Sequence, residues 1–254
     1  MASKTNFGSF ENKIPADYVP SLKEVDRYSK IHNGLDGYSQ QEKALDKLFF
    51  ELCPKNTDIE DVLLKCSTLN DFYSTNIFDI YKLAKHIMGI LNLDERMNKC
   101  DLDLVDEIAN ASGHRVYSFA TKYCSHHHPK EYAIYDNYVE RVLLYFQKRD
   151  KFFKDGFNGQ YLRTYKQFNK VLNGFCERYN IPLKSDMKIL DRYLWQLGKK
   201  YYSPYPIQRT EVMEKYIERN QISILEDPIE QEFQMREIWE AAALENHSSN
   251  CANY

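Results

Sequence analysis

The sequence predicts an all-α protein, and three observations lead to this fold class. Apolar residues recur at helical spacing through most of the chain, and helix-capping residues precede several of these segments. Only residues 132–135 have strand character, which is too short a stretch to build a sheet. The 9 Gly and 8 Pro are too few for a loop-rich β protein or a Gly-rich nucleotide-binding protein. We therefore expect a two-lobed helical fold with extra C-terminal helices.

The composition limits the class of protein and its compartment. With 254 residues, of which 43% are hydrophobic and 28% charged, the chain is expected to be soluble and globular. No stretch approaches the roughly 18 apolar residues of a membrane span, and the N-terminus lacks the apolar region of a secretory signal. The 6 Cys show no metal-ligand spacing, so we interpret them as buried small hydrophobes in a reducing compartment. The expected location is the cytoplasm, or the nucleus in a eukaryote.

The first expected segment is an irregular lead-in over residues 1–37, because it carries Pro15, Pro20, Gly34 and Gly37. The helical core is expected over residues 38–203. In that core a capping box at 39–42 opens a helix that ends before Pro54. Further helices are expected after Asp58, after Ser74 or Thr75, after Asp101 or Asp103, over about 116–125, from Asn137, and over about 160–179 and 185–200.

The C-terminal extension, residues 204–254, is expected to add two helices over about 208–220 and 228–245 and to end in a frayed segment. The last of these helices has an apolar face that carries Phe233 and Trp239. It either closes the core of the protein itself or forms the contact of a homodimer.

The formal net charge of −3 conceals an uneven distribution. Residues 1–110 carry 13 Lys and Arg against 19 Asp and Glu, residues 111–202 carry 17 against 8, and residues 203–254 carry 4 against 10. The basic middle segment is either a phosphate-binding face or a lysine-rich solvated surface.

The middle segment also holds the candidate catalytic carboxylate. Residues 113–143 are expected to form a helix, a turn ended by Pro129, a short extended piece and a second helix that begins after Asp136. As a helix cap alone, Asp136 would contribute about 1 kcal/mol. If it faces a cleft, the same carboxylate stabilises a developing cation or positions a water as general base.

Residues 134–142, IYDNYVERV, resemble the core of the helix-hairpin-helix DNA glycosylase superfamily. Residues 62–71 are similar to an early core helix of that family, and residues 194–199 are similar to its closing core helix. The likeness covers about residues 40–200. It implies a fold of the glycosylase type, with Asp136 as the catalytic carboxylate.

The sequence departs from this family at two motifs. The hairpin of the family has a Gly-x-Gly turn that presents N–H groups to a phosphate, whereas residues 111–115 hold one Gly, and Arg115 is the candidate replacement. Bifunctional members carry a Lys early in the next helix that forms a Schiff base. The nearest amine here is Lys122, which is either a second candidate catalytic residue or a solvated helix Lys. We therefore expect a monofunctional enzyme that uses water. The iron–sulfur cysteines of some relatives are missing, and no cofactor is expected.

Three consecutive histidines, 126–128, fall in the predicted turn before Pro129. Adjacent side chains point in different directions, so we do not expect a metal site there. They form either a hydrated turn or a polar loop at the mouth of a cleft, where a histidine contacts a phosphate or a base edge. In the second case, protonation near pH 6.5 would couple binding to pH.

Aromatic and basic residues are the other candidates for a nucleic-acid site. An extruded base needs stacking partners, and the candidate pocket residues are Phe72, Tyr73, Tyr135 and Tyr138, each of which alternatively packs in the core. Trp195 is expected to be buried. Candidate nucleic-acid contacts are His114, Arg115, His126, Arg141, Lys148 and Lys151, although Arg141 alternatively pairs with a core carboxylate.

From these features we predict a DNA-binding, base-flipping repair protein that hydrolyses the base–sugar bond of a damaged or modified nucleotide. The alternative is a helical module that binds nucleic acid or protein without catalysis. A third hypothesis is a metal-dependent hydrolase that uses the three histidines.

Overall fold

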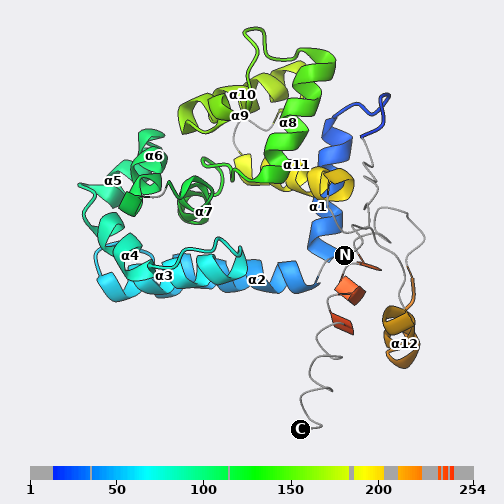
Figure 1. Ribbon diagram of the computed structural model, residues 1–254, viewed down its shortest axis with the longest axis horizontal. Coiled ribbons are helices and arrows are strands. Elements are labelled where there is room, and N and C mark those ends of the chain that lie inside the picture. Colours follow the sequence, from blue (N-terminus) through cyan, green and yellow to red (C-terminus); the bar gives the residue numbers. More distant parts are fainter. Residues whose placement is uncertain are drawn as a thin grey trace, which may run out of the picture.

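The computed structural model describes residues 14–34, 36–113, 115–182, 186–202, 211–224, 234–235, 237–239 and 241–242. Within these ranges the regular secondary structure is helical and no strand occurs, which confirms the all-α fold class (Figure 1). The helices are α1 (Leu22–Gly34), α2 (Asp36–Asp46), the π-helical turn η1 (Lys47–Leu52), α3 (Ile59–Phe72), α4 (Ile80–Met88), α5 (Leu93–Asn98), α6 (Asp103–Ala109), the 3₁₀ turn η2 (Ala111–Gly113), α7 (Tyr117–His127), α8 (Asn137–Asp150), α9 (Gly159–Leu162), α10 (Tyr165–Arg178), α11 (Met187–Tyr202) and α12 (Glu211–Arg219).

Helix α7 occupies the middle of the molecule. In Figure 1, α2 and α3 follow one another along one side, and α8, α9 and α10 group on the opposite side. Helix α11 packs against both α1 and α8, while α7 packs against α3 and α6. One large apolar core joins these elements, so the ends of several helices meet around α7.

The expectation of an irregular lead-in is wrong over residues 22–34, which form α1, and over residues 36–37, where α2 begins before the capping box predicted at 39–42. Ser21 caps α1, since its Oγ accepts a hydrogen bond from the Glu24 amide at 3.3 Å. Val25 and Tyr28 lie one turn apart and are fully buried against the core. The Ser-x-x-Glu signature of a capping box was present in the sequence, and the two prolines before it obscured the helix.

The turn predicted at the three histidines is wrong for His126 and His127, because α7 continues through His127, and only His128 lies in the bend before Pro129. The last turn of α7 is buried, and the Nε2 atoms of His126 and His127 each have a partner within the protein. The backbone amide of His128 still bonds to the carbonyl of Cys124 at 2.9 Å, so the helix ends directly before Pro129.

Aspartate caps set the start of three other helices. The caps predicted at Asp58 and Asp136 are confirmed, since each side chain accepts a hydrogen bond from a backbone amide in the first helical turn. The third predicted cap, at Ser74 or Thr75, is not used, and α4 begins instead after Asp79, whose Oδ1 accepts from the Lys82 amide at 2.9 Å. Ser74 has a φ of 48°, a left-handed conformation that a cap does not adopt.

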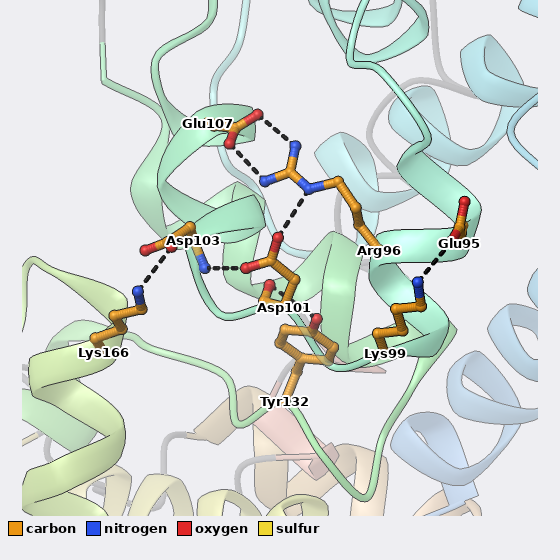
Figure 2. Close-up of polar contacts among 8 residues, drawn as sticks. All are labelled: Glu95, Arg96, Lys99, Asp101, Asp103, Glu107, Tyr132 and Lys166. Carbon is orange, nitrogen blue, oxygen red and sulfur yellow. Dashed lines mark hydrogen bonds and ion pairs between the residues drawn. The ribbon is translucent and has the colours of Figure 1, made fainter.

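Ion pairs join α5, α6 and α10 at one end of the molecule (Figure 2). Arg96 binds Glu107 through both guanidinium Nη atoms, and its Nε donates to Asp101 at 2.8 Å. The Tyr132 hydroxyl donates to the Asp101 carbonyl at 3.1 Å and so attaches the extended segment before α8 to this end. Each exposed pair contributes little alone, and the Tyr132 hydrogen bond is the contact that connects this group to the segment before Asp136.

The C-terminal residues form a cluster apart from the main core. Met213 of α12 packs with Met235 and Ile238 in this second cluster. Most of the last expected helix, 228–245, lies outside the described residues, so its assignment to the core or to a dimer contact remains a prediction.

Candidate functional site

A cavity of about 420 Å³ opens among α2, the end of α3, α7, the start of α8 and α11. This volume is typical of sites that hold small molecules or single nucleobases. Its wall contains both candidate catalytic residues, Asp136 and Lys122, together with aromatic rings and a second set of charged side chains. These charged and aromatic residues come from five elements that are distributed along the sequence.

Asp136 lies where α8 begins. Its backbone is extended, and its Oδ1 accepts a hydrogen bond from the Val139 amide at 2.9 Å. Burial raises the pKa of this carboxyl, while the backbone bonds and the charge of Lys122 act in the opposite direction. The residue is therefore both a helix cap and part of the cavity wall, so the two interpretations of the sequence are compatible.

Lys122 is not a solvated lysine, because only 5% of it is exposed. Its Nζ donates to the Ser118 hydroxyl at 2.6 Å and lies 5.1 Å from the centre of the Tyr73 ring. Burial lowers the pKa of Lys122 to about 8, although Asp136 and Asp191 favour its charged form. An amine with such a pKa has a substantial unprotonated fraction near neutral pH.

A second carboxyl in the cavity, Asp191 of α11, was not singled out from the sequence. Its Oδ2 accepts a hydrogen bond from the Ile134 amide at 2.8 Å, and 5% of the residue is exposed. Burial raises the pKa of Asp191 to about 8, so at neutral pH the carboxyl is mainly protonated.

The remaining charged groups of the cavity, also not singled out from the sequence, form a cluster between α2 and α11. Glu42 binds Lys188 at 2.6 Å and also pairs with Arg192. Burial alone would raise the pKa of Glu42, but these two cations lower it to about 2. The spacing of residues 188, 191 and 192 could have revealed this site, since charged residues on one face of an otherwise buried helix require partners.

The aromatic candidates divide between the cavity and the core. Phe72, Tyr73 and Tyr138 line the cavity, as does Trp195, for which simple burial was expected. Tyr135 does not line it, and its assignment to a base pocket is wrong. Its ring packs against Tyr117 and Phe168 in the core, and its hydroxyl donates to Glu140.

The candidate phosphate contacts are not assembled around the cavity. Arg115 forms an ion pair with Asp106 and donates to the Arg163 carbonyl at 2.7 Å. Arg141 donates to the Tyr202 carbonyl rather than to a core carboxylate, and it stacks on the Tyr202 ring.

Lys148 and Lys151 are exposed at the opposite end of α8 from Asp136. At 1.5 Å per residue, that end is roughly 20 Å away. Arg141 and Lys148, seven residues apart, share the exposed face of α8. His114 lies outside the described residues.

His126 is buried behind the cavity wall rather than exposed at a cleft mouth. Its Nε2 lies 2.8 Å from the Tyr73 hydroxyl, and burial lowers the pKa of the imidazole to about 3. The neighbouring His127 faces Lys65 and Tyr123 instead. The expected protonation of His126 near pH 6.5, and with it a coupling of binding to pH through this residue, is therefore wrong.

The described residues contain neither a metal-binding cluster nor a membrane-spanning helix. In the ranges that the structure describes, no group of three or more His, Cys, Asp or Glu side chains converges on a point where a metal ion could be held. Every helix within these ranges is too short or too polar to span a lipid bilayer.

Comparison with known proteins identifies a family. Over 151 residues the chain is 48% identical to a protein of Haemophilus influenzae described as "Uncharacterized protein", a match that spans 58% of this chain and 71% of that protein. The chain belongs to the family of this protein. Residues 24–131 also match the family described as "HI_0787_N: N-terminal domain". No solved structure matches the chain.

The matched domain covers only one side of the cavity. It runs from α1 to the turn after α7, and so includes Glu42, Tyr73 and Lys122. Asp136 and Asp191 lie beyond its end. The cavity is thus completed by the segment that follows the domain.

Proposed function

We propose that this protein is a DNA N-glycosylase that hydrolyses the base–sugar bond of a nucleotide turned out of the helix, with Asp136 as its catalytic carboxylate. The observation that carries the proposal is the position of Asp136 in the wall of a cavity that the Lys122 amine and several aromatic rings also line. The resemblance of residues 134–142 to helix-hairpin-helix glycosylases supports the same assignment of roles.

The chemistry of glycosidic hydrolysis fits this set of groups. Cleavage of the bond between C1′ and the base leaves positive charge on the sugar, and a carboxylate stabilises that charge most effectively where water is excluded. The aromatic rings of Tyr73, Tyr138 and Trp195 supply surfaces on which an extruded base can stack. Asp136 would also orient the water that attacks C1′.

The test uses duplexes that each hold one modified or damaged base, with release of the free base measured by mass spectrometry. We expect release from at least one duplex, and its loss in Asp136→Asn at unchanged DNA affinity. Full activity of Asp136→Asn, or equal release from free 2′-deoxynucleosides, would contradict the proposal. Duplex binding with a steep salt dependence and no released base would favour the non-catalytic module.

Lys122 supports a second candidate activity, strand cleavage through an imine. An amine whose pKa is lowered to about 8 is a suitable nucleophile for a sugar carbon. A Schiff base between Lys122 and an abasic sugar would be trapped by borohydride as a stable protein–DNA adduct. If the wild-type protein forms this adduct and Lys122→Gln does not, Lys122 is the nucleophile of a lyase. If base is released but no adduct forms, the protein catalyses only the monofunctional reaction.

A further inference from the structure

Asp191 occupies the cavity without a counter-ion. One of its oxygens, Oδ2, is held by the Ile134 amide at 2.8 Å. No ion pair to Asp191 and no hydrogen bond to its other oxygen occurs among the described residues, and the side chain is part of the cavity wall. For a carboxyl that is 95% buried and has no ion-pair partner, burial favours the protonated form.

The nearby cations have other partners. Lys188 and Arg192, on the same helix, are paired with Glu42, and Lys122 donates to Ser118. Burial therefore determines the titration of Asp191 and raises its pKa to about 8, against the opposing charges of Arg192 and Lys188. The titratable groups that surround it are Lys188 and Arg192 from α11, Asp136 before α8, Lys122 from α7 and Tyr73 after α3.

We propose that Asp191 is the general acid that protonates the departing base, while Asp136 faces the sugar. This inference rests on the proposed glycosylase function and deepens it, because it defines the substrate class as nucleotides whose base is uncharged and needs a proton to leave. Two carboxyls in one site, one kept protonated and the other ionised, are the arrangement that glycosidic hydrolysis uses.

The proposed step transfers one proton to the base and adds one water to the sugar. The electron pair of the bond between C1′ and the base moves onto the base, and the Asp191 proton moves to a nitrogen or oxygen of the base, which leaves as a neutral molecule. A water molecule attacks C1′ and gives one proton to Asp136. Transfer of this proton through solvent to Asp191 restores both carboxyls, so one water is consumed for each base released.

The test compares two leaving groups in single-turnover reactions. One duplex holds hypoxanthine, a neutral base, and the other holds 7-methylguanine, which is already cationic and leaves without a proton donor. We expect Asp191→Asn to slow hypoxanthine release by about 100-fold or more and to leave 7-methylguanine release unchanged. With wild-type protein, the rate of hypoxanthine release should fall above about pH 8, where Asp191 loses its proton.

Other outcomes separate the two proposals. Equal slowing of both bases by Asp191→Asn would show a structural role through Ile134, and no slowing would exclude Asp191; either result overturns the inference and leaves the glycosylase function intact. If wild-type protein releases neither of these two bases but does release another, the inference about Asp191 fails and the glycosylase function stands; if it releases no base from any duplex, both proposals fail. Asp186→Asn is the matched control, because its side chain caps the start of α11 through the Ile189 amide at 3.2 Å, and both rates should remain unchanged.

Discussion

At the scale of single residues, the cavity wall contains ionisable side chains whose charged forms are disfavoured by burial. Asp136 has a raised pKa and Lys122 a lowered one, in both cases because burial disfavours the charged form. Such opposed shifts are frequent where side chains exchange protons with a substrate. Because such shifts affect the free energy of unfolding, the contribution of each side chain can be measured in unfolding experiments.

Asp136 allows the helix cap to be separated from the proposed catalysis. Asp136→Asn keeps an oxygen for the Val139 amide and removes a buried charge, so we expect no loss of stability. Asp136→Ala removes the cap and should lower the free energy of unfolding by about 1 kcal/mol. Urea unfolding of both variants tests this, and an Asn variant as unstable as the Ala variant would contradict the separation. Base release should be lost in both.

The buried amine predicts a dependence of stability on pH. The pKa of Lys122 is about 8 in the folded protein, against an ordinary value of 10.5. Between these values the unfolded chain binds more protons, so stability should rise with pH by about 1.4 kcal/mol per unit from this group. Lys122→Met should abolish that rise in unfolding experiments from pH 8 to 10.5. An unchanged slope would mean that Lys122 titrates normally.

At the scale of elements, the position of Asp136 depends on how closely α8 approaches α11. Gly198 of α11 lies against Tyr138, and a Cβ at residue 198 would come within 2.6 Å of the Tyr138 Cβ and 2.7 Å of its carbonyl oxygen. A backbone contact cannot be relieved by a side-chain rotation. The helices would have to separate, and Asp136 lies only two residues from the point of contact.

We therefore expect Gly198→Ala to lower the free energy of unfolding by about 1–3 kcal/mol. The proposed base release should fall by more than the loss of folded protein explains. Gly37→Ala in α2 is the matched control, since a Cβ there has no neighbour within 4 Å, and it should be neutral or slightly stabilising. The test compares the melting temperatures of the two variants in thermal unfolding. Equal melting temperatures would contradict this role of Gly198.

The elements differ in how far the sequence predicts them. Helix α8 and its cap follow from a local pattern, and the structure confirms both. Helix α1 was missed because prolines outweighed a valid capping box, and α7 was ended too early because polar histidines suggest solvent. The partners of those histidines, Lys65 and Tyr73, come from α3 and its end, so no local pattern reveals them.

The residues of the candidate site also differ in whether a local sequence pattern reveals them. Asp136, Phe72, Tyr73 and Tyr138 were found because their neighbours in sequence define them. Asp191 and the Glu42 cluster depend on contacts between distant helices, which a single sequence does not contain.

At the scale of the whole molecule, buried neutral histidines predict sensitivity to acid. Burial lowers the pKa of His32 to about 4 and that of His126 to about 3, and places the pKa of His127 well below its ordinary value. Below pH 6.5 the unfolded chain binds protons that the folded protein does not, so stability should fall steadily from pH 6.5 toward pH 4. His126→Gln should reduce that slope by the equivalent of one proton. A free energy of unfolding that does not change over this pH range would contradict the buried, neutral state of these histidines.

In the function that we propose, the cavity stabilises positive charge at a sugar through Asp136. The most direct measurement compares binding of two duplexes, one with a cationic pyrrolidine in place of the nucleotide and one with a neutral tetrahydrofuran. We predict that the wild-type protein binds the cationic duplex about 100-fold more tightly, and that Asp136→Asn loses this preference. Equal affinity of the wild-type protein for both duplexes would contradict the account.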